Sequence, residues 1–308
     1  MPDLTVITTT YNRADCLHNC YSSLKKQTCM DFQWLVVDDG STDDTRNVIK
    51  QFQDTPHVFE IDYIYKENGG KHTALNTAHP YIRGKYVLIL DSDDALTADA
   101  VEFVLEKWKL WTNDPDVGQL IFLKGKDINS PICYVKNAEK KVDILREDRI
   151  CNGGRDCCEV FRKELFTKYP FPVFPGEKFI GEGAAFYFIE RSSKGVYYNR
   201  ILYICNYRDD GLTKAGRQMR IRNPLGGKFN SNLYMDKRLP TKTRIKKAML
   251  YVCYAKFSGD TLSNIITGTT HRLLVAAAII PGSILYLFWK IKYKENKACR
   301  IPNSRASV

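Results

Sequence analysis

The chain has 308 residues, of which 44% are hydrophobic and 12% aromatic, so it can bury one large core and is neither disordered nor fibrous. Its net charge of +11 is concentrated towards the C-terminus, where residues 207–256 hold 13 basic and 3 acidic side chains and residues 290–308 hold 6 and 1. Such an excess suits substrate phosphates or anionic lipid headgroups, and because no nucleic-acid-binding motif accompanies it, nucleic acid is not expected as a partner.

The first 125 residues alternate short apolar runs with helical patterns. Strands are expected at residues 4–9, 33–38, 58–65 and 86–90. Helices are expected at residues 14–27, 43–53, 71–81 and 98–111. This order predicts a mainly parallel sheet with helices on both faces, in which ligands bind beyond the carboxyl ends of the strands. Met1 leads almost directly into the first strand, without a secretory leader, so we expect the bulk of the chain to stay in the cytoplasm.

The remaining chain divides by composition. Residues 126–207 are less regular and carry dense Gly, Pro and aromatic residues, and we assign them to the same domain as the first half. We therefore predict one domain over residues 1–213, a basic helical extension over 214–271, and an apolar segment with a basic tail over 272–308.

Ten cysteines occur without a C-x-x-C pair or a regular framework, and a chain of this length folds without disulfides. We interpret them as reduced, mostly buried thiols. Cys16 with Cys20 and the adjacent Cys157 and Cys158 leave a structural zinc site as the alternative, although the usual ligand spacings are absent.

Two acidic clusters follow predicted strands. Asp91 to Asp94 (DSDD) places three carboxylates in four residues, which repel one another unless a cation such as Mg²⁺ or Mn²⁺ neutralises them. Asp38 to Asp44 (DDGSTDD) adds carboxylates that can accept hydrogen bonds from a base or a ribose. The alternatives are helix N-caps for both clusters, with a turn at Gly40 in the second.

Taken with a third loop, these clusters resemble the family 2 glycosyltransferases of GT-A fold. The four motifs stand in the family's order: Thr10-Tyr11-Asn12-Arg13, Asp38 to Asp43, Asn68-Gly69-Gly70-Lys71 through Asn76, and the Asp91 to Asp94 DXD-type motif. One departure is Thr9, where the family usually has proline at a backbone bend. The resemblance implies a nucleotide-sugar-binding half over residues 1–125 and an acceptor-facing half over 126–213.

The same resemblance implies the donor-binding residues. They are Thr10, Tyr11, Arg13, Asp38, Asn68, Lys71 and Asp91. Asp38 would accept from the base N3–H, while Asn68 and Lys71 would contact the nucleoside and diphosphate. Asp93 would coordinate Mn²⁺ or Mg²⁺, which stabilises the leaving nucleoside diphosphate. We expect a UDP-sugar, with GDP left open. His72 lies inside the third motif and is a further candidate for donor contact.

Inverting transfer needs a general base for the acceptor hydroxyl. In related enzymes it is an acidic residue about 90 residues after the metal-binding loop, and Glu182 lies 89 residues after Asp93. Relatives often carry Glu-Asp there with Asp as the base, whereas this chain has Gly183, so the role falls to Glu182. Glu177 is the second candidate, and a glutamate capping the next helix is the alternative interpretation.

Residues 207–213 (YRDDGLT) resemble a C-terminal signature of the bacterial polysaccharide branch of this family. Arg208 there would pair with the departing diphosphate, and a simple turn with a surface arginine is the alternative.

An uncharged run of 17 residues, 273–289, follows the basic extension. At 1.5 Å per residue it extends about 26 Å, short of a typical hydrocarbon core, and Pro281-Gly282 interrupts it. Since both flanks are basic, we expect a monotopic or interfacial anchor, such as a shallow hairpin turning at Pro281-Gly282, with a spanning helix and a buried core helix as alternatives.

The sequence thus predicts an α/β, GT-A (Rossmann-like) fold with a membrane-associated helical extension. The expected activity is inverting transfer from a nucleotide sugar to a hydroxyl of a glycan or lipid-linked glycan acceptor, in surface polysaccharide synthesis at the cytoplasmic membrane face. The alternatives are a polyprenyl-phosphate sugar synthase, which needs no base like Glu182, and a non-catalytic nucleotide-sugar-binding protein.

Overall fold

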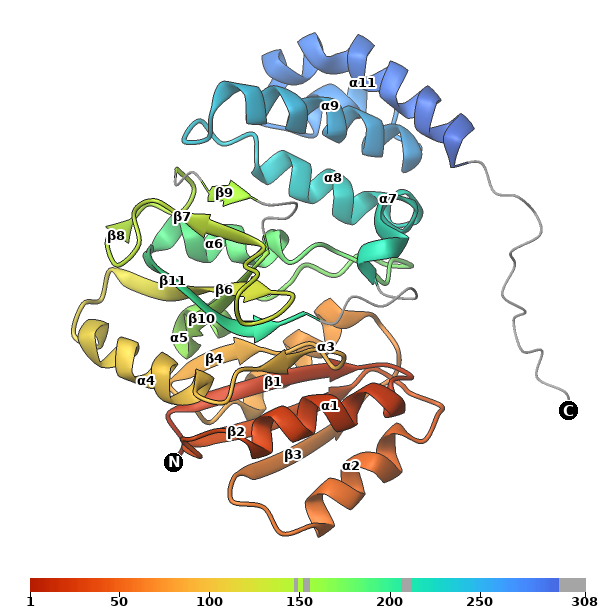
Figure 1. Ribbon diagram of the computed structural model, residues 1–308. Helices are drawn as coiled ribbons and strands as arrows, with labels where there is room; N and C mark the ends of the chain where they lie inside the picture. The colour runs from red at the N-terminus through yellow and green to blue at the C-terminus, as the bar shows by residue number, and fades with distance from the viewer. Residues whose placement is uncertain (147–148, 152–155, 206–211, 294–308) are drawn as a thin grey trace, which may run out of the picture.

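The computed structural model describes residues 1–146, 149–151, 156–205 and 212–293 (Figure 1). Its strands are β1 (Leu4–Thr10), β2 (Phe32–Asp38), β3 (Glu60–Tyr65), β4 (Tyr86–Ile89), β5 (Ala95–Leu96), β6 (Val117–Gly125), β7 (Cys133–Val135), β8 (Lys141–Val142), β9 (Arg149–Cys151), β10 (Cys157–Arg162) and β11 (Lys194–Ile204). Its helices are α1 (Ala14–Lys25), α2 (Thr45–Asp54), α3 (Lys71–Ala78), the 3₁₀ helix η1 (His79–Tyr81), α4 (Ala100–Trp111), α5 (Lys163–Lys168), α6 (Gly183–Ser192), α7 (Leu212–Arg222), α8 (Pro224–Leu233), α9 (Thr241–Phe257), α10 (Leu262–Thr267) and α11 (Arg272–Lys292).

The main sheet is mixed. Its strand order is β3-β2-β1-β4-β10-β6-β11-β5, with β8 paired to β11, and β7 and β9 form a separate pair. The first four strands in that order are parallel, as predicted for the N-terminal half. β10 enters between β4 and β6 antiparallel to both, so the second half of the domain continues the same sheet. β1 and β2 are buried along their whole length, which agrees with their continuous apolar and β-branched sequence.

Helices cover both faces of the sheet and enclose two cores. One core packs α1, α2 and α4 on the sheet through residues such as Leu17, Val48 and Trp108. The other packs α3, α5 and α6 through residues such as Leu75 and Phe166. The loops after β1, β2 and β4 therefore lie at one edge, between these helical layers.

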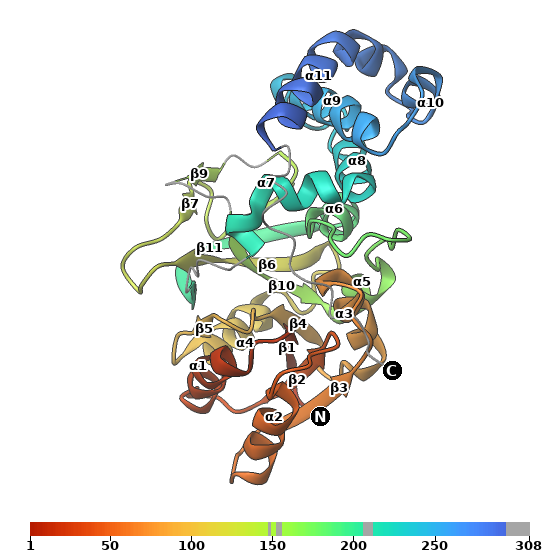
Figure 2. The ribbon, with the colours of Figure 1, turned by 90° about the vertical axis from the view of Figure 1, so that its right-hand side faces the viewer.

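The C-terminal helices stack on the sheet and its covering helices. α8 packs between α6 and α9, and α11 packs along α9 on the far side from α8 (Figures 1 and 2). Glycines permit the close approaches: a Cβ at Gly227 of α8 would lie 2.9 Å from the Tyr254 ring of α9, and a Cβ at Gly282 of α11 would lie 2.6 Å from Val252 Cβ. The extension is thus a packed helical layer.

The prediction of a hairpin at Pro281-Gly282 is wrong, because α11 is one continuous helix of 21 residues. A proline inside a helix removes one backbone donor and usually kinks the helix, but here packing against α9 buries Val275, Ala278 and Gly282 along one face. Within the described residues, α11 is the one helix long and apolar enough to cross a membrane by length and composition.

Candidate active site

The three polar loops meet at the carboxyl edge of the sheet. Thr10 at the end of β1 pairs with Asp38 at the end of β2. β4 runs along the other side of β1, and the Leu90 N–H donates to Ile7 O at 2.9 Å, so the DSDD segment begins beside the β1 loop. Parallel pairing of these neighbouring strands explains why motifs separated by about 80 residues of sequence come together.

Hydrogen bonds lock the first two loops to each other. Asn12 has a left-handed backbone, φ 51°, its N–H donates to Ser41 Oγ at 2.8 Å, and its Oδ1 accepts from the Thr42 N–H at 2.8 Å. Asp43 Oδ2 accepts from the Ala14 N–H at the start of α1. The loops after β1 and β2 are therefore held in a fixed arrangement relative to each other.

Asp39 organises the third motif, a role that sequence reasoning missed. Its carboxylate accepts from the backbone N–H groups of Gly69 and Gly70 at 2.9 and 2.6 Å, and from Lys66 Nζ at 2.6 Å. The Asn68 amide donates to the backbone carbonyl and the carboxylate of Asp39 at 2.9 and 3.1 Å. This buried carboxylate thus fixes the segment before α3 on the end of β2.

Asp38 and Asn68 are placed at the site, but their polar atoms already have partners in the protein. Asp38 Oδ1 accepts from the Ser41 N–H and Oδ2 from the Tyr63 hydroxyl, each at 2.7 Å. Asn68 Oδ1 accepts from Lys178 Nζ at 2.7 Å. Both side chains hold loops in place through these contacts, and their donor contacts stay predictions.

Two buried polar atoms at the same edge have no protein partner within the described residues. They are Thr10 Oγ1 and His72 Nδ1, and burial lowers the pKa of His72, so its imidazole is held neutral. Tyr11 is 48% exposed beside them. Unsatisfied buried groups next to an exposed aromatic ring are what a nucleotide-binding surface offers its ligand.

A lysine bridges two carboxylates from distant segments. Lys71 Nζ lies 2.5 Å from Asp91 Oδ1 and 2.7 Å from Glu182 Oε1. Lys71 begins α3, Asp91 follows β4, and Glu182 is the N-cap residue of α6. The structure thereby brings three predicted site residues into direct contact.

Lys124 and Tyr203 complete this cluster, and sequence reasoning missed both. Burial raises the pKa of Asp91, but the charges of Lys71 and Lys124 and hydrogen bonds from Lys71 and Tyr203 outweigh burial and lower that pKa to about 2. Lys124 Nζ lies 4.3 Å from the Tyr203 ring centroid, and the Tyr203 hydroxyl accepts from the Asp91 N–H at 2.9 Å. Asp91 is therefore held ionised.

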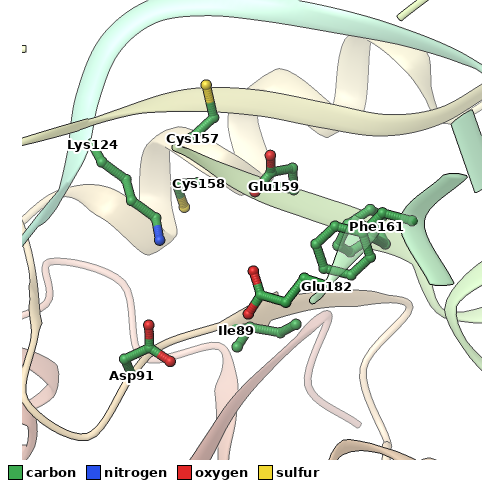
Figure 3. A pocket seen from close by; sticks show the side chains of 9 residues that line it. Ile89, Asp91, Lys124, Cys157, Cys158, Glu159, Phe161 and Glu182 are labelled. Carbon is green, nitrogen blue, oxygen red and sulfur yellow. The ribbon is translucent and has the colours of Figure 1, made fainter. Parts of the chain in front are cut away.

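A small hollow opens beside the cluster. Figure 3 shows its lining, in which the side chains of Asp91, Lys124, Glu159 and Glu182 converge from four segments of the chain. Phe161 forms an apolar part of the wall. Polar groups converging on a partly apolar hollow can position a sugar hydroxyl beside a carboxylate.

Asp93 fits a divalent cation that arrives with a phosphate. Burial and the charge of Asp91 raise the pKa of Asp93, against the charges of Arg13 and Lys71. Within the described residues, no group of three or more His, Cys, Asp or Glu side chains is placed to hold a metal ion unaided. Mg²⁺ is commonly bound by one or two carboxylates together with substrate phosphates. The Asp93 carboxylate, whose charge is disfavoured beside Asp91, suits such an ion.

The second candidate base is a helix cap. Both Glu177 oxygens accept backbone N–H groups at the start of α8, from Leu225 at 2.6 Å and Gly226 at 2.8 Å. Glu177 therefore caps α8, whereas Glu182, the N-cap residue of α6, makes no side-chain capping hydrogen bond and its carboxylate instead contacts Lys71. Arg208 lies outside the described residues.

The cysteines that the structure describes with their side chains are free thiols. Cys16 and Cys20 are buried under the sheet, and Cys133 Sγ lies 3.4 Å from Cys157 Sγ. Burial raises the pKa of Cys20 and of Cys158 to about 12, so these thiols stay protonated at neutral pH.

Comparison with known proteins assigns the class. The family model described as "Glycosyl transferase family 2" matches residues 5–168, more than half of the chain, so the protein belongs to the family 2 glycosyltransferases. The predicted family is confirmed.

Several curated relatives are similar to part of this chain. The GalNAc(5)-diNAcBac-PP-undecaprenol beta-1,3-glucosyltransferase of Campylobacter jejuni is 27% identical over 73% of this chain and 72% of its own length. Glycosyltransferase GlyA of Streptococcus pneumoniae is 37% identical over 37% of this chain, and TuaG of Bacillus subtilis, a putative teichuronic acid biosynthesis glycosyltransferase, is 35% identical over 34%. The chain spans only 16% of GlyA and 41% of TuaG.

Solved structures share the fold. Staphylococcus aureus TarS, residues 1–349, matches with a TM-score of 0.60 and 15% identity over 98% of this chain and 95% of that one. The mannosyltransferase PcManGT from Pyrobaculum calidifontis, solved with GDP-Man and Mn²⁺, matches with a TM-score of 0.55 and 18% identity over 95% and 84%. The predicted α/β, GT-A fold is confirmed.

Proposed function

We propose that this glycosyltransferase is an inverting, Mn²⁺- or Mg²⁺-dependent enzyme that moves a sugar from a UDP-sugar to a hydroxyl of a glycan or lipid-linked glycan in surface polysaccharide synthesis. The observation that carries the proposal is the Lys71 bridge between Asp91 and Glu182 at the edge where the donor loops meet. The structure of TarS with UDP-GlcNAc, which matches over 92% of this chain with a TM-score of 0.57, supports a UDP donor. The names of the Campylobacter and Bacillus relatives support the acceptor class.

The donor lies along the loops after β1 and β2 in this proposal. Tyr11 and the unsatisfied Thr10 hydroxyl face the nucleotide, and Asp93 would hold the cation. When bound, the cation draws off the charge that develops on the departing diphosphate. Lys71 and Arg13 add positive charge on the same side, which further stabilises that leaving group.

Glu182 accepts the proton of the acceptor hydroxyl. The hydroxyl oxygen then forms a bond to the anomeric carbon while the bond to the diphosphate breaks, and the nucleoside diphosphate leaves with that electron pair. Lys71 holds Glu182 in place before the acceptor arrives, and its contact with Asp91 keeps the ammonium centred between the two carboxylates. Attack on the face opposite the leaving group inverts the anomeric configuration.

Glu182→Gln tests this role. We expect transfer to fall about 10²- to 10⁴-fold while UDP-sugar binding is kept, because the amide cannot accept the proton. Glu164→Gln, at an exposed position on α5, is the matched control and should retain full transfer. Full transfer by Glu182→Gln would support a polyprenyl-phosphate sugar synthase instead, and absence of any turnover by the wild type with intact donor binding would support a binding protein.

We further propose that α11 lies in the plane of the cytoplasmic membrane face. One side of α11 packs on α9, and the opposite side exposes a set of large apolar residues: Leu273, Ile280, Ile284, Leu287, Phe288 and Ile291. Lys290 and Lys292 stand beside this apolar face, where they suit anionic headgroups. A spanning orientation would draw the packed, basic α9 into the hydrocarbon layer, which is costly.

Flotation with vesicles containing phosphatidylglycerol tests this placement. Leu287→Glu with Phe288→Glu should reduce vesicle binding about tenfold or more, because each glutamate replaces an inserted apolar side chain. Val58→Glu, at a position 73% exposed in the catalytic domain, is the control and should bind as the wild type does. Unchanged flotation of the double variant would refute the in-plane orientation.

A further inference from the structure

The C-terminal extension holds cations that its own acids cannot balance. Residues 212–293 contain 15 basic and 2 acidic side chains. Both acids are already committed, Asp236 to Arg191 at 2.8 Å and Asp260 to Lys228 at 2.6 Å. Across the described residues, four cations of this extension form no ion pair with a carboxylate: Arg217, Arg220, Lys246 and Lys247. Arg220 and Lys246 lie close enough to Lys247 for their charges to act on it. Their positive charge is not compensated by carboxylates of the described residues, so an anion from outside the chain would bind favourably here.

Lys247 is the most enclosed of the four. It projects from α9 towards α8, where its Nζ lies 3.5 Å from Asn230 Oδ1 and 4.6 Å from the Tyr234 ring centroid. Burial, together with the charges of Arg220 and Lys246, lowers the pKa of Lys247 to about 8. A lysine kept partly dry beside other cations is costly for the fold, and such groups concentrate at ligand sites.

The cluster borders the loop that carries the proposed base. The two side chains that contact Lys247 also contact the residue after Glu182, since a Cβ at Gly183 would lie 2.8 Å from the Tyr234 hydroxyl and 3.3 Å from Asn230 Nδ2. One layer of side chains therefore separates Lys247 from the backbone at Glu182. The cationic cluster and the catalytic hollow are neighbours.

The cluster also faces inward. α9 presents Val252 to α11 and Lys247 to α8, so Lys247 points to the catalytic body and away from the exposed side of α11. Figure 2 shows α7 and α8 between the sheet and the α9–α11 layer. An anion bound here would lie between the proposed membrane face and the proposed base.

We propose that Arg220 and Lys247 bind a phosphate or diphosphate group of the acceptor, the one that joins its sugar to its lipid. The inference rests on the proposed function, because it places the acceptor sugar at Glu182 and the lipid near α11. A guanidinium offers paired donors to phosphate oxygens and an ammonium adds a point charge, so the two side chains suit this group. The open choice between a free and a lipid-linked glycan acceptor is thereby narrowed to the lipid-linked class.

Titration calorimetry of the full chain with inorganic pyrophosphate tests the site, in EDTA so that no metal contributes, with and without saturating UDP. We expect binding that persists in the presence of UDP and weakens about tenfold or more in Lys247→Gln, the scale of one lost charge-assisted contact. Lys242→Gln, at an exposed position at the start of α9, is the control and should bind pyrophosphate as the wild type does.

Three outcomes would overturn the proposal. The first is unchanged pyrophosphate affinity in Lys247→Gln, and the second is pyrophosphate binding that UDP abolishes. The third is a Lys247→Gln variant that loses binding to phosphatidylglycerol vesicles but keeps its pyrophosphate affinity. That third result would assign the cluster to bilayer headgroups. UDP affinity with Mn²⁺, measured in the same preparations, reports separately on the donor site. Failure there would count against the proposed function and leave the pyrophosphate result unaffected.

Discussion

Replacing Lys247 with methionine should stabilise the protein at neutral pH. The pKa of Lys247 falls from 10.5 to about 8 through burial and the charges of Arg220 and Lys246. Since a tenfold change in proton affinity corresponds to about 1.4 kcal/mol, keeping this lysine charged in the folded state costs up to about 3 kcal/mol. The side chain is partly exposed, and solvent screens part of this cost, so we expect Lys247→Met to raise the free energy of unfolding by about 1–2 kcal/mol.

The gain should depend on pH with a definite sign. Below pH 8 the lysine is charged in the folded and unfolded states, and the cost is complete. Between pH 8 and 10.5 the folded protein releases this proton first, so wild-type stability rises relative to the variant and the difference between them closes. Urea unfolding of both proteins at several pH values from 7 to 10 measures the difference. A variant less stable than the wild type at pH 7, or a gain that is constant across this range, would refute the reasoning.

Two further substitutions separate structural from catalytic carboxylates. Asp39→Asn should lower the free energy of unfolding by about 3 kcal/mol, because it breaks a buried ion pair with Lys66 and weakens the anchoring of the loop before α3. An unchanged urea midpoint would count against that role. Glu177→Gln should lower the free energy of unfolding by about 1 kcal/mol, because α8 loses its charged cap, but the variant should retain transfer activity. A loss of transfer as large as that of Glu182→Gln would make Glu177 a candidate base again.

The elements of the N-terminal half follow from sequence patterning, because β1, β2 and β4 are short apolar or β-branched runs and β3 alternates polar with apolar residues. The predicted strand at residues 86–90 appears as β4, and the predicted helix at 71–81 appears as α3 followed by η1, where Pro80 lies within the final turn. Parallel strands bring their carboxyl ends to one edge, so the meeting of the three polar loops was also predictable.

Other parts of the site depend on information that local sequence does not carry. Asp38 and Asp39 are adjacent and chemically identical. Which of them accepts hydrogen bonds from the segment before α3 depends on the backbone direction at the end of β2. Lys124 and Tyr203 belong to β6 and β11, whose positions follow from the insertion of β10 beside β4. That pairing is non-local, so no periodicity around either residue predicts its approach to Asp91.

The packing of the C-terminal helices also fixes the position of Glu182 relative to α11. α6 begins beside Glu182, its Tyr187 hydroxyl donates to Asp236 at 2.7 Å, and Arg191 pairs with the same carboxylate, which ties α6 to the chain just after α8. Glu177 caps the other end of α8, and glycine contacts join α8 to α9 and α9 to α11. With α11 in the membrane plane, the height of Glu182 above the lipid is fixed by helix packing, since a packed layer deforms little. Under the proposed function, an acceptor must carry its reactive hydroxyl at that height, so we expect the length of the glycan already attached to the lipid to determine which acceptors the enzyme extends.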